Sequence, residues 1–253
     1  MPMQVDLNSD MGESFGPWTM GDDRALLDVV TSANIACGFH AGDPDVMART
    51  MRQAADKGVG IGAHPGFHDL QGFGRRRINL SAEELGNMVA YQLGAAQGIA
   101  RSLGTQVRHL KLHGALSNMA TDDPAIARAC YQAALRVDPQ IIIVALAGTR
   151  MEAVARELGA TVAAEIFADR AYEDDASLVD RSKPGAVLHD PAQAAGRMIA
   201  MLRDGAIHTL GGKRIPCRID TICVHGDTAE AVAMATALRR DLEQGGIAVR
   251  RFG

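Results

Sequence analysis

The stretch "SANIACGFHAGD", residues 32–43, alternates apolar side chains with small or polar ones and ends in a histidine, a glycine and an aspartate. On a β-strand, Ile35 and Cys37 would point to one face, and Asn34 and His40 to the other. A strand of an open parallel sheet is buried on both faces and normally reads as a continuous apolar run. The alternation instead predicts a β/α barrel, in which one strand face meets the outer helices and the other faces a polar interior.

The same alternation recurs in most of the other strand-like segments. We expect strands near residues 3–8, 33–39, 59–63, 107–112, 141–146, 161–166 and 219–224. In the fourth of these, Leu110 and Leu112 would face the helices, whereas Lys111 would face the interior. The seventh fits less neatly, because Thr221 and Cys223 share a face that is not clearly polar.

Helix-like segments separate these strands almost from end to end, which is typical of a parallel sheet with crossover helices. Helix starts are well marked. Asp43-Pro44, for example, places a capping side chain before a proline at the first helical position. No linker-like change in composition divides the chain. We therefore predict an α/β protein with a single β/α-barrel domain over residues 1–253, seven-stranded or with a short eighth strand at "IAVRR", residues 247–251.

The composition narrows the class of ligand. The 253 residues are 47% hydrophobic, with a net charge of −4 and 4% aromatic residues. A nucleic-acid surface would show a basic stripe or stacking aromatic rings, so a small polar metabolite is favoured. No apolar run approaches the roughly 18 residues that a membrane span requires. The four cysteines lack CxxC spacing and no apolar signal region opens the chain, so we expect a cytoplasmic protein with free thiols.

Polar side chains follow several of the expected strands. In parallel α/β folds, ligands bind beyond the carboxyl ends of the strands, where the loops converge. The residues that would meet at this rim are Asp6, Asn8, Asp10, His40, Asp43, His64, Lys111, His113, Glu165, His225 and Asp227. A single histidine after a strand is more often structural. An inward lysine is harder to explain in that way, because an isolated buried charge is costly. Together these residues predict a catalytic or binding centre.

Two long segments interrupt the alternation of strands and helices, at residues 65–80 and 167–190. Loops of this length are usually functional lids or disordered, and both carry clustered charges. Arg75 belongs to a run of three arginines that is either a solvated surface or a mobile anion clamp. Arg170, in the second segment, offers the planar two-donor group that binds carboxylate or phosphate. We expect this second segment to cover the rim. By contrast, "GGKRIP", residues 211–216, lacks the spacing of a phosphate loop and is expected to be a surface hairpin.

Several of these motifs resemble one family. The motifs are "DLNSDMGESFG", "SANIACGFHAGDP", "GVGIGAHPGF", "FGRR", "RHLKLHGAL", "FADRAY" and "CVHGD". Together they resemble the LamB/YcsF family over nearly the whole chain, with the first three blocks long enough to be specific. The resemblance implies a barrel similar to that of polysaccharide deacetylases. It also implies the role of the A subunit of the bacterial ATP-dependent 5-oxoprolinase. That enzyme uses 5-oxo-L-proline, ATP and water to form L-glutamate, ADP and phosphate, and it needs partner subunits B and C.

The rim residues can be given roles in that reaction. An unstrained lactam is a poor electrophile, and phosphorylation of its amide oxygen would let water attack the ring carbon. The catalytic candidates are Asp6, Asp10, His40, His64, Lys111 and His113, among which a carboxylate or a histidine would take the proton from water. The candidates for binding substrate or phosphate are Asn8, Asp43, Arg75, Glu165, Arg170, His225 and Asp227. ATP would be a co-substrate, with Mg²⁺ as its counterion. The sequence leaves open which subunit binds ATP and whether the chain forms a homo-oligomer.

Two other functions compete with this one. Asp6 or Asp10, together with His40 and His64, is a suitable set of ligands for Zn²⁺ with an open water position. The chain would then be a metal-dependent deacetylase or amidohydrolase acting on a small amide or sugar. The remaining alternative is a non-catalytic scaffold subunit that binds a metabolite and docks partners.

Overall fold

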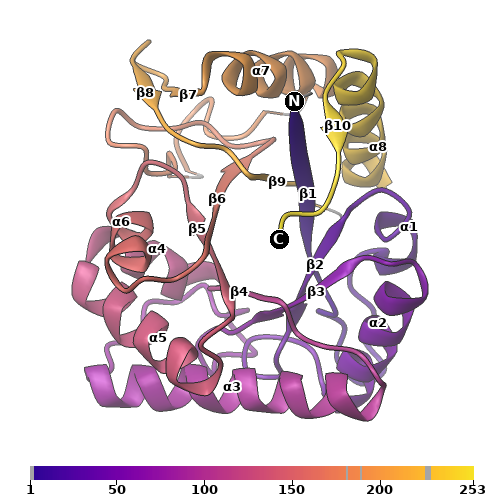
Figure 1. Ribbon diagram of the computed structural model, residues 1–253, viewed down its shortest axis with the longest axis vertical. Helices are drawn as coiled ribbons and strands as arrows, with labels where there is room; N and C mark the ends of the chain where they lie inside the picture. Colours follow the sequence, from indigo (N-terminus) through magenta and orange to yellow (C-terminus); the bar gives the residue numbers. More distant parts are fainter. Residues whose placement is uncertain (1–2, 181, 189, 226–228) are drawn as a thin grey trace.

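Seven parallel strands form a closed barrel at the centre of the molecule (Figure 1). The computed structural model describes residues 3–180, 182–188, 190–225 and 229–253. The barrel strands are β1 (Gln4–Met11), β2 (Ser32–Ala36), β3 (Gly60–His64), β4 (His109–Lys111), β5 (Ile142–Leu146), β6 (Val162–Phe167) and β9 (Thr221–Cys223). Each of the first six pairs with the next in chain order, and β9 closes the ring by pairing with both β6 and β1. The seven-stranded barrel that strand alternation predicts is therefore confirmed.

A short additional strand lies outside the closed ring. β10 (Ala248–Val249) pairs in parallel with the first residues of β1, with Gln4 opposite Ala248. It falls within residues 247–251, where the sequence indicates an eighth strand. β9 pairs with β1 further along, at residues 6–8. β10 and β9 therefore pair with successive parts of β1.

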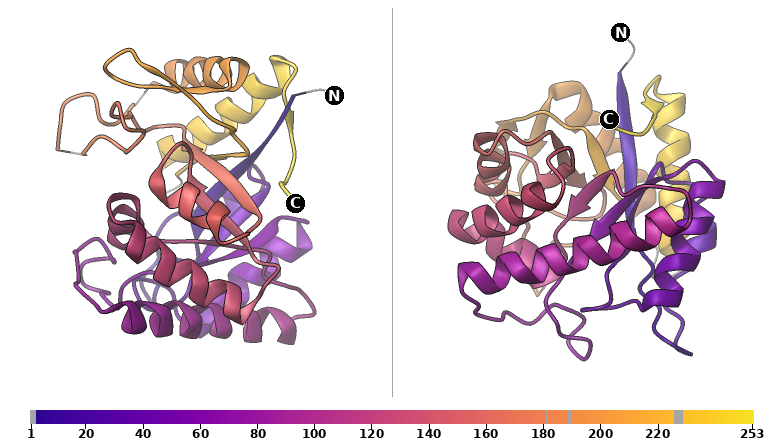
Figure 2. Two further views of the ribbon diagram at one scale, coloured as in Figure 1. Left: turned by 60° about the vertical axis from the view of Figure 1, so that its left-hand side comes forward. Right: turned by 60° about the horizontal axis from the view of Figure 1, so that its bottom comes forward.

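Helices surround the barrel and connect successive strands (Figures 1 and 2). They are α1 (Asp23–Leu26), α2 (Pro44–Asp56), α3 (Ala82–Ser102), α4 (Gly114–Asp122), α5 (Pro124–Val137), α6 (Arg150–Glu157), α7 (Pro191–Asp204) and α8 (Ala229–Gln244). The long helix α3 packs against α5, and α7 packs against α8. The Asp43 side chain accepts hydrogen bonds from the backbone N–H groups of Asp45 and Val46, which confirms it as the cap of α2.

An antiparallel hairpin projects between α7 and β9. β7 (Ala206–His208) pairs with β8 (Arg214–Pro216), so the segment 211–216 belongs to a hairpin, as its sequence indicates. None of the helices that the structure describes is long and apolar enough to cross a membrane. All four cysteines are free thiols.

The barrel interior is a hydrogen-bonded polar network. Asn34 Nδ2 donates to Asn8 Oδ1 over 2.7 Å, and Asn8 Nδ2 donates to Thr221 Oγ1 over 2.7 Å. His109 Nε2 lies 2.8 Å from Asn34 Oδ1. Gly62 leaves room for that imidazole, because a Cβ there would lie 2.1 Å from His109 Nε2. Since Thr221 takes part, the seventh strand follows the same inward and outward alternation as the others.

The opposite faces of the strands pack against the helices. Leu7, Ile35, Ile61, Leu110 and Ile222 are each at most 2% exposed and belong to one large hydrophobic cluster. Burial of side chains of this size contributes about 1.5–3 kcal/mol each relative to exposure. The apolar residues thus hold the barrel together from outside, and its interior is left for polar groups.

Candidate functional site

Lys111 lies at the centre of the polar interior near the carboxyl ends of the strands. Its side chain is 6% exposed, and Nζ lies 3.1 Å from Asp10 Oδ1 and 2.7 Å from Glu165 Oε1. Nζ also lies 5.0 Å above the Phe167 ring, in a cation–π contact. Burial alone would lower the pKa of Lys111, but the neighbouring carboxylates outweigh it and hold the pKa well above its usual value. The lysine is therefore a fixed positive charge, as its position on the strand predicts.

Asp10 connects Lys111 to the histidines. Its Oδ2 lies 3.3 Å from His64 Nε2, while its Oδ1 accepts from Asn34 Nδ2 over 2.9 Å. Burial raises the pKa of Asp10, but His64 and Lys111 outweigh that effect and hold the pKa well below its usual value. The Asp10 side chain is 19% exposed, more than its partners. It is thus an ionised carboxylate that solvent can reach.

Three histidines form a tight cluster beside Asp10. His64 Nε2 lies 3.0 Å from His113 Nδ1. The rings of His40 and His113 stack with centroids 3.7 Å apart and an angle of 6° between their planes. His64 is the last residue of β3, and His40 and His113 lie shortly after β2 and β4, so barrel closure brings together three residues that are far apart in the sequence.

Glu13 completes this cluster and was not predicted. Its Oε1 lies 3.7 Å from His40 Nε2 and 3.9 Å from His113 Nδ1. One ligand atom from each of the four residues lies within 4.8 Å of the others. The available sequence signal was its place three residues after Asp10 in "DMGES", just beyond the end of β1.

The other ring nitrogens of two of these histidines are oriented by backbone carbonyls. His64 Nδ1 lies 2.8 Å from Lys111 O, and His113 Nε2 lies 2.8 Å from Phe73 O. A carbonyl oxygen only accepts, so each of these nitrogens carries the hydrogen. Burial, followed by the neighbouring histidines, lowers the pKa of His40 well below its usual value and that of His113 to about 3. His40 and His113 are therefore neutral at pH 7.

The loop between β3 and α3 packs closely over the histidines. A Cβ at Gly66 would lie 2.7 Å from His40 Nδ1, and a Cβ at Gly74 would lie 2.7 Å from His40 Cβ. Phe73, whose carbonyl accepts from His113, has a φ of 54°. This left-handed conformation costs a non-glycine residue about 1–2 kcal/mol, and such strain concentrates at functional sites. The loop is thus shaped around the imidazole rings.

Some of the predicted residues lie apart from this centre. Asp6 is 1% exposed and lies deeper in the barrel, where Thr31, Ser32 and Thr221 each donate a hydroxyl hydrogen bond to it over 2.5–2.7 Å. Burial raises its pKa to about 6, although the three hydroxyl groups oppose this. Asn8 lies in the same interior network and has one further contact toward the site, 3.4 Å from Lys111 Nζ. Asp6 and Asn8 therefore support the floor of the site, and neither is among its accessible groups.

The remaining predicted residues occupy the surroundings of the site. Asp43 caps α2 and also accepts from the backbone N–H of Gly16. Arg75 is exposed and lies 4.9 Å over the Phe73 ring. Arg170 is 7% exposed and donates to the carbonyl of Val179. Asp227 lies outside the described residues.

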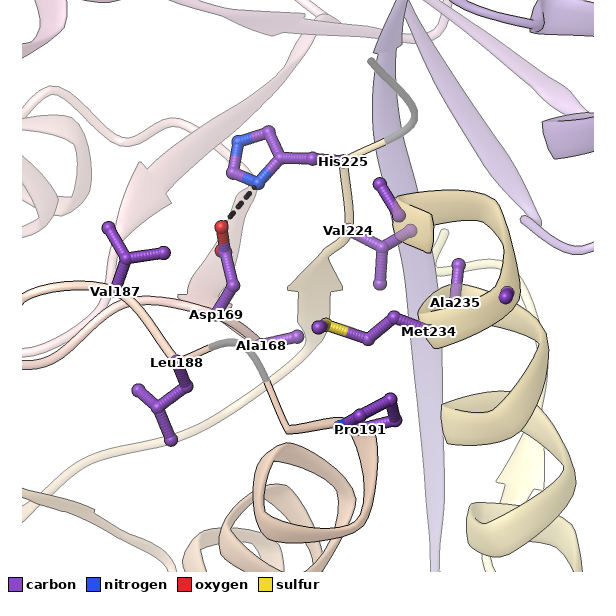
Figure 3. Close-up of a pocket in the computed structure, with 11 residues that line it drawn as sticks. Ala168, Asp169, Val187, Leu188, Pro191, Val224, His225, Met234 and Ala235 are labelled. Carbon is purple, nitrogen blue, oxygen red and sulfur yellow. Dashed lines mark hydrogen bonds and ion pairs between the residues drawn. The ribbon is translucent and has the colours of Figure 1, made fainter. Parts of the chain in front are cut away.

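His225 lies beside an apolar cavity of about 540 Å³ (Figure 3). Its Nδ1 lies 2.9 Å from Asp169 Oδ2, a partner that the sequence reasoning missed. The His225 ring lies 6.1 Å from the Phe167 ring, which in turn contacts Lys111, so the cavity adjoins the site. Val187 and Leu188 of the segment 167–190 line it together with His225, while the expectation that this segment covers the rim stays a prediction.

Comparisons with known proteins agree on one family. Residues 5–253 match the model of the LamB/YcsF family. A protein from Ruegeria pomeroyi, named as the A subunit of 5-oxoprolinase, is 64% identical over 249 residues, which cover 98% of each chain. The crystal structure of a lactam utilization protein from Thermus thermophilus has a TM-score of 0.93 at 44% identity, with 99% of this chain and 100% of that chain covered.

More distant structures share the architecture only. A family 4 carbohydrate esterase from Streptomyces lividans, in complex with acetate, has a TM-score of 0.51 at 12% identity and covers 99% of this chain and 93% of that chain. The predicted similarity to deacetylase-like barrels is therefore confirmed for the fold.

Proposed function

The chain belongs to the LamB/YcsF family, and we propose that it is the A subunit of an ATP-dependent 5-oxoprolinase, which hydrolyses 5-oxo-L-proline to L-glutamate. The observation that carries this proposal is the 64% identity, over 98% of each chain, to the Ruegeria pomeroyi protein of that name. A site with one fixed cation, an ionised carboxylate and three histidines supports it, because lactam hydrolysis needs charge stabilisation and proton transfer.

The chemistry requires activation of the lactam. Transfer of the γ-phosphoryl group of ATP to the amide oxygen releases ADP and makes the ring carbon electrophilic. Water adds to that carbon, the ring C–N bond breaks, and the nitrogen takes up a proton. A second water then hydrolyses the resulting acyl phosphate to glutamate and phosphate. The residues of this chain act on the water and on the anions that develop.

Asp10 is our candidate for the group that takes the proton from water. It is ionised, and its side chain is 19% exposed, so water can reach it. His64 Nε2 lies 3.3 Å from Asp10 Oδ2 and orients this carboxylate. Lys111 stabilises negative charge that develops nearby, since a fixed charge in a water-poor site is worth far more than in bulk solvent. Arg75 and Arg170 are candidates to hold the substrate carboxylate or the phosphate, as is His225.

We assign ATP activation mainly to the partner subunits B and C. The chain contains no phosphate loop, because "GGKRIP" lacks both the first glycine and the Ser/Thr after lysine. ATP, with Mg²⁺ as its counterion, is then a co-substrate of the complex. We also place the protein in the cytoplasm, where its four free thiols stay reduced.

Reconstitution tests this function directly. The chain is mixed with subunits B and C from its own organism, and glutamate release from 5-oxo-L-proline is followed with and without ATP. We expect glutamate only when all three subunits and ATP are present. Equal turnover without this chain would overturn the proposal. A complex that forms and turns over normally with a His64→Ala variant would instead indicate a scaffold role.

A second candidate function is a metal-dependent amidohydrolase or deacetylase. The observation that favours it is the group of Glu13, His40, His64 and His113, whose donor atoms lie within 4.8 Å of one another. Such an enzyme would need no ATP, because an ion held by these four residues would supply an activated water. Release of acetate from N-acetyl sugars, or opening of a lactam by the isolated chain with Zn²⁺ alone, would support this function over the first.

A further inference from the structure

Two histidine nitrogens in the site face each other, and their rings are oriented by backbone carbonyls. His64 donates through Nδ1 to Lys111 O, and His113 donates through Nε2 to Phe73 O. The other two ring nitrogens, His64 Nε2 and His113 Nδ1, lie 3.0 Å apart, and Asp10 Oδ2 lies 3.3 Å from His64 Nε2. Each of these three atoms can offer a lone pair, so either a shared proton or a bound cation would hold them together.

His40 and Glu13 add two more donors at the same place. His40 is 1% exposed, and neither of its ring nitrogens has a hydrogen-bond partner among the described residues. A buried polar atom without a partner costs about 1–3 kcal/mol, so its retention needs an explanation. The His40 Nε2 atom lies 3.7 Å from Glu13 Oε1, and all four donor atoms lie within 4.8 Å of one another.

Acidic side chains also lie at this place. The carboxyl groups of Asp10 and Glu165 both contact Lys111, and Glu13 lies beside His40 and His113. Oxygen donors are therefore available next to the imidazole nitrogens.

We propose that Glu13, His40, His64 and His113 bind one divalent transition-metal ion, and that Zn²⁺ is the best match for this donor set. Three imidazoles with one carboxylate are typical ligands of Zn²⁺ and of related ions such as Co²⁺. The backbone carbonyls behind His64 and His113 are the usual outer partners of metal-binding histidines, since they aim the free lone pair at the ion. The close packing of Gly66 and Gly74 holds the rings in place.

This ligand set differs from the one that the sequence suggested. Asp6 accepts three hydroxyl hydrogen bonds deep in the barrel, and Asp10 is paired with Lys111. In the proposed ligand set, Glu13 and His113 take the place of Asp6 and Asp10. The proposal is independent of the 5-oxoprolinase function, because an ion in this cluster is compatible with either candidate activity.

Metal binding is measured on protein purified without a histidine tag, stripped with a chelator and then supplied with Zn²⁺ or Co²⁺. We expect one equivalent of bound metal by elemental analysis and calorimetry. For Co²⁺ we expect visible absorption bands of a low-coordinate site. Zn²⁺ should also raise the thermal midpoint, because an ion that binds only the folded state stabilises it. None of these readouts depends on turnover.

Variants identify the ligands. Glu13→Gln removes one metal-binding oxygen from a side chain that is 10% exposed, so the fold should survive. We expect metal affinity to fall about 10-fold or more, because losing a ligand should cost at least as much as losing an outer-shell partner. His113→Asn should reduce affinity further. His208→Asn is the matched control, since this histidine lies on the β7–β8 hairpin and pairs with Asp204. It should bind metal like the wild type.

Two outcomes would overturn the proposal. One is a wild-type protein that takes up neither Zn²⁺ nor Co²⁺ while histidine ¹⁵N spectra show a proton shared between His64 and His113. The other is binding that Glu13→Gln and His113→Asn leave unchanged, or that His208→Asn reduces equally. In the latter case the metal lies elsewhere on the protein.

Discussion

Lys111 is the residue on which the charge balance of the barrel interior depends. Its ammonium group lies between the carboxylates of Asp10 and Glu165, both of which belong to other strands. Removing one partner of a buried ion pair usually costs more than the pair contributes, because a charge is left without compensation. Stability and catalysis must therefore be measured separately for any variant at this position.

For Lys111→Met we expect turnover of the reconstituted complex to fall about 100-fold or more, because a fixed charge near a developing anion contributes a few kcal/mol. We also expect the free energy of unfolding to fall by about 3–5 kcal/mol. The double variant Lys111→Met/Glu165→Gln removes one uncompensated charge and should regain part of that stability while turnover stays low. Turnover within about threefold of wild type would make Lys111 a structural ion-pair partner only.

Asp6 gives the protein a pH-dependent stability. Burial raises its folded-state pKa from 3.8 to about 6, so the folded protein binds this proton more tightly than the unfolded chain. The contribution to stability is full below pH 3.8 and is lost as the pH rises through 6. Two pKa units correspond to about 3 kcal/mol.

The test for Asp6 is urea unfolding between about pH 3 and pH 8, a range that spans both pKa values, 3.8 and about 6. Asp6→Asn keeps the shape of the side chain but has no proton to release. We expect the wild type to lose stability over this range relative to the variant, with most of the difference appearing below about pH 7. Parallel stability curves for the two proteins would show that Asp6 titrates normally in the folded state.

At the level of elements, the loop between β3 and α3 shapes the histidine cluster through its glycines. Gly74 has a φ of 62°, and an added Cβ would lie 2.7 Å from His40 Cβ and 2.9 Å from His113 Cδ2. Gly58 has a similar φ of 70°, but a Cβ there would meet nothing within 4 Å. A comparison of alanine substitutions at Gly58 and Gly74 therefore separates the cost of backbone strain from the cost of a steric clash.

We expect Gly58→Ala to cost about 1 kcal/mol, from the left-handed backbone alone. Gly74→Ala should cost a further 1–3 kcal/mol or so, because the methyl group overpacks the site. Gly74→Ala should also shift the histidine NMR signals, which Gly58→Ala should leave unchanged. Equal losses of stability with unchanged histidine signals would mean that the loop does not constrain the rings.

The segment 167–190 is the second element with an expected function. It supplies Asp169, Val187 and Leu188 to the cavity beside His225. We predict that it acts as a lid, with backbone amides that exchange faster than those of β1 and β6 and that become protected when substrate is added. Hydrogen exchange followed by mass spectrometry measures this, with α3 as the internal reference. Protection equal to that of the strands, unchanged by substrate, would make the segment a fixed wall.

For the whole molecule, barrel closure assembles the site from distant parts of the chain. Lys111 contacts Asp10 and Cys223, which lie 101 and 112 residues away in sequence. The chain that closes this barrel contains no sequence element that resembles a nucleotide-binding loop. This is the reason for our proposal that subunits B and C activate the lactam with ATP.

We therefore predict that the isolated chain forms no ADP from ATP, even with 5-oxo-L-proline present. Adding subunits B and C should start ADP formation and glutamate release together. A coupled assay for ADP measures the first and an amino-acid assay the second. Steady ADP formation by the isolated chain, unaffected by the partners, would show that this subunit binds and hydrolyses ATP itself.

The barrel and most of its site followed from sequence patterns because those patterns are local. Which way a side chain points depends on the alternation of its own strand, so Leu110 and Lys111 could be assigned to opposite faces. Strand ends carry His40, His64 and His113 to one rim once the strands are parallel. The LamB/YcsF motifs led independently to the same fold.

Only the tertiary structure decided how deep each residue lies and which groups meet. Asp6 and Asp10 share a strand face, yet Asp6 is enclosed by hydroxyl groups, whereas Asp10 reaches solvent. Glu13 and Asp169 lie outside the strands and contact His40 and His225, respectively. The alternation of side chains along a strand does not predict the course of a loop. The ring nitrogens of His64 and His113 were oriented by carbonyls of Lys111 and Phe73. These contacts depend on strand register and loop packing, which arise between segments far apart in the chain and are therefore absent from any local pattern.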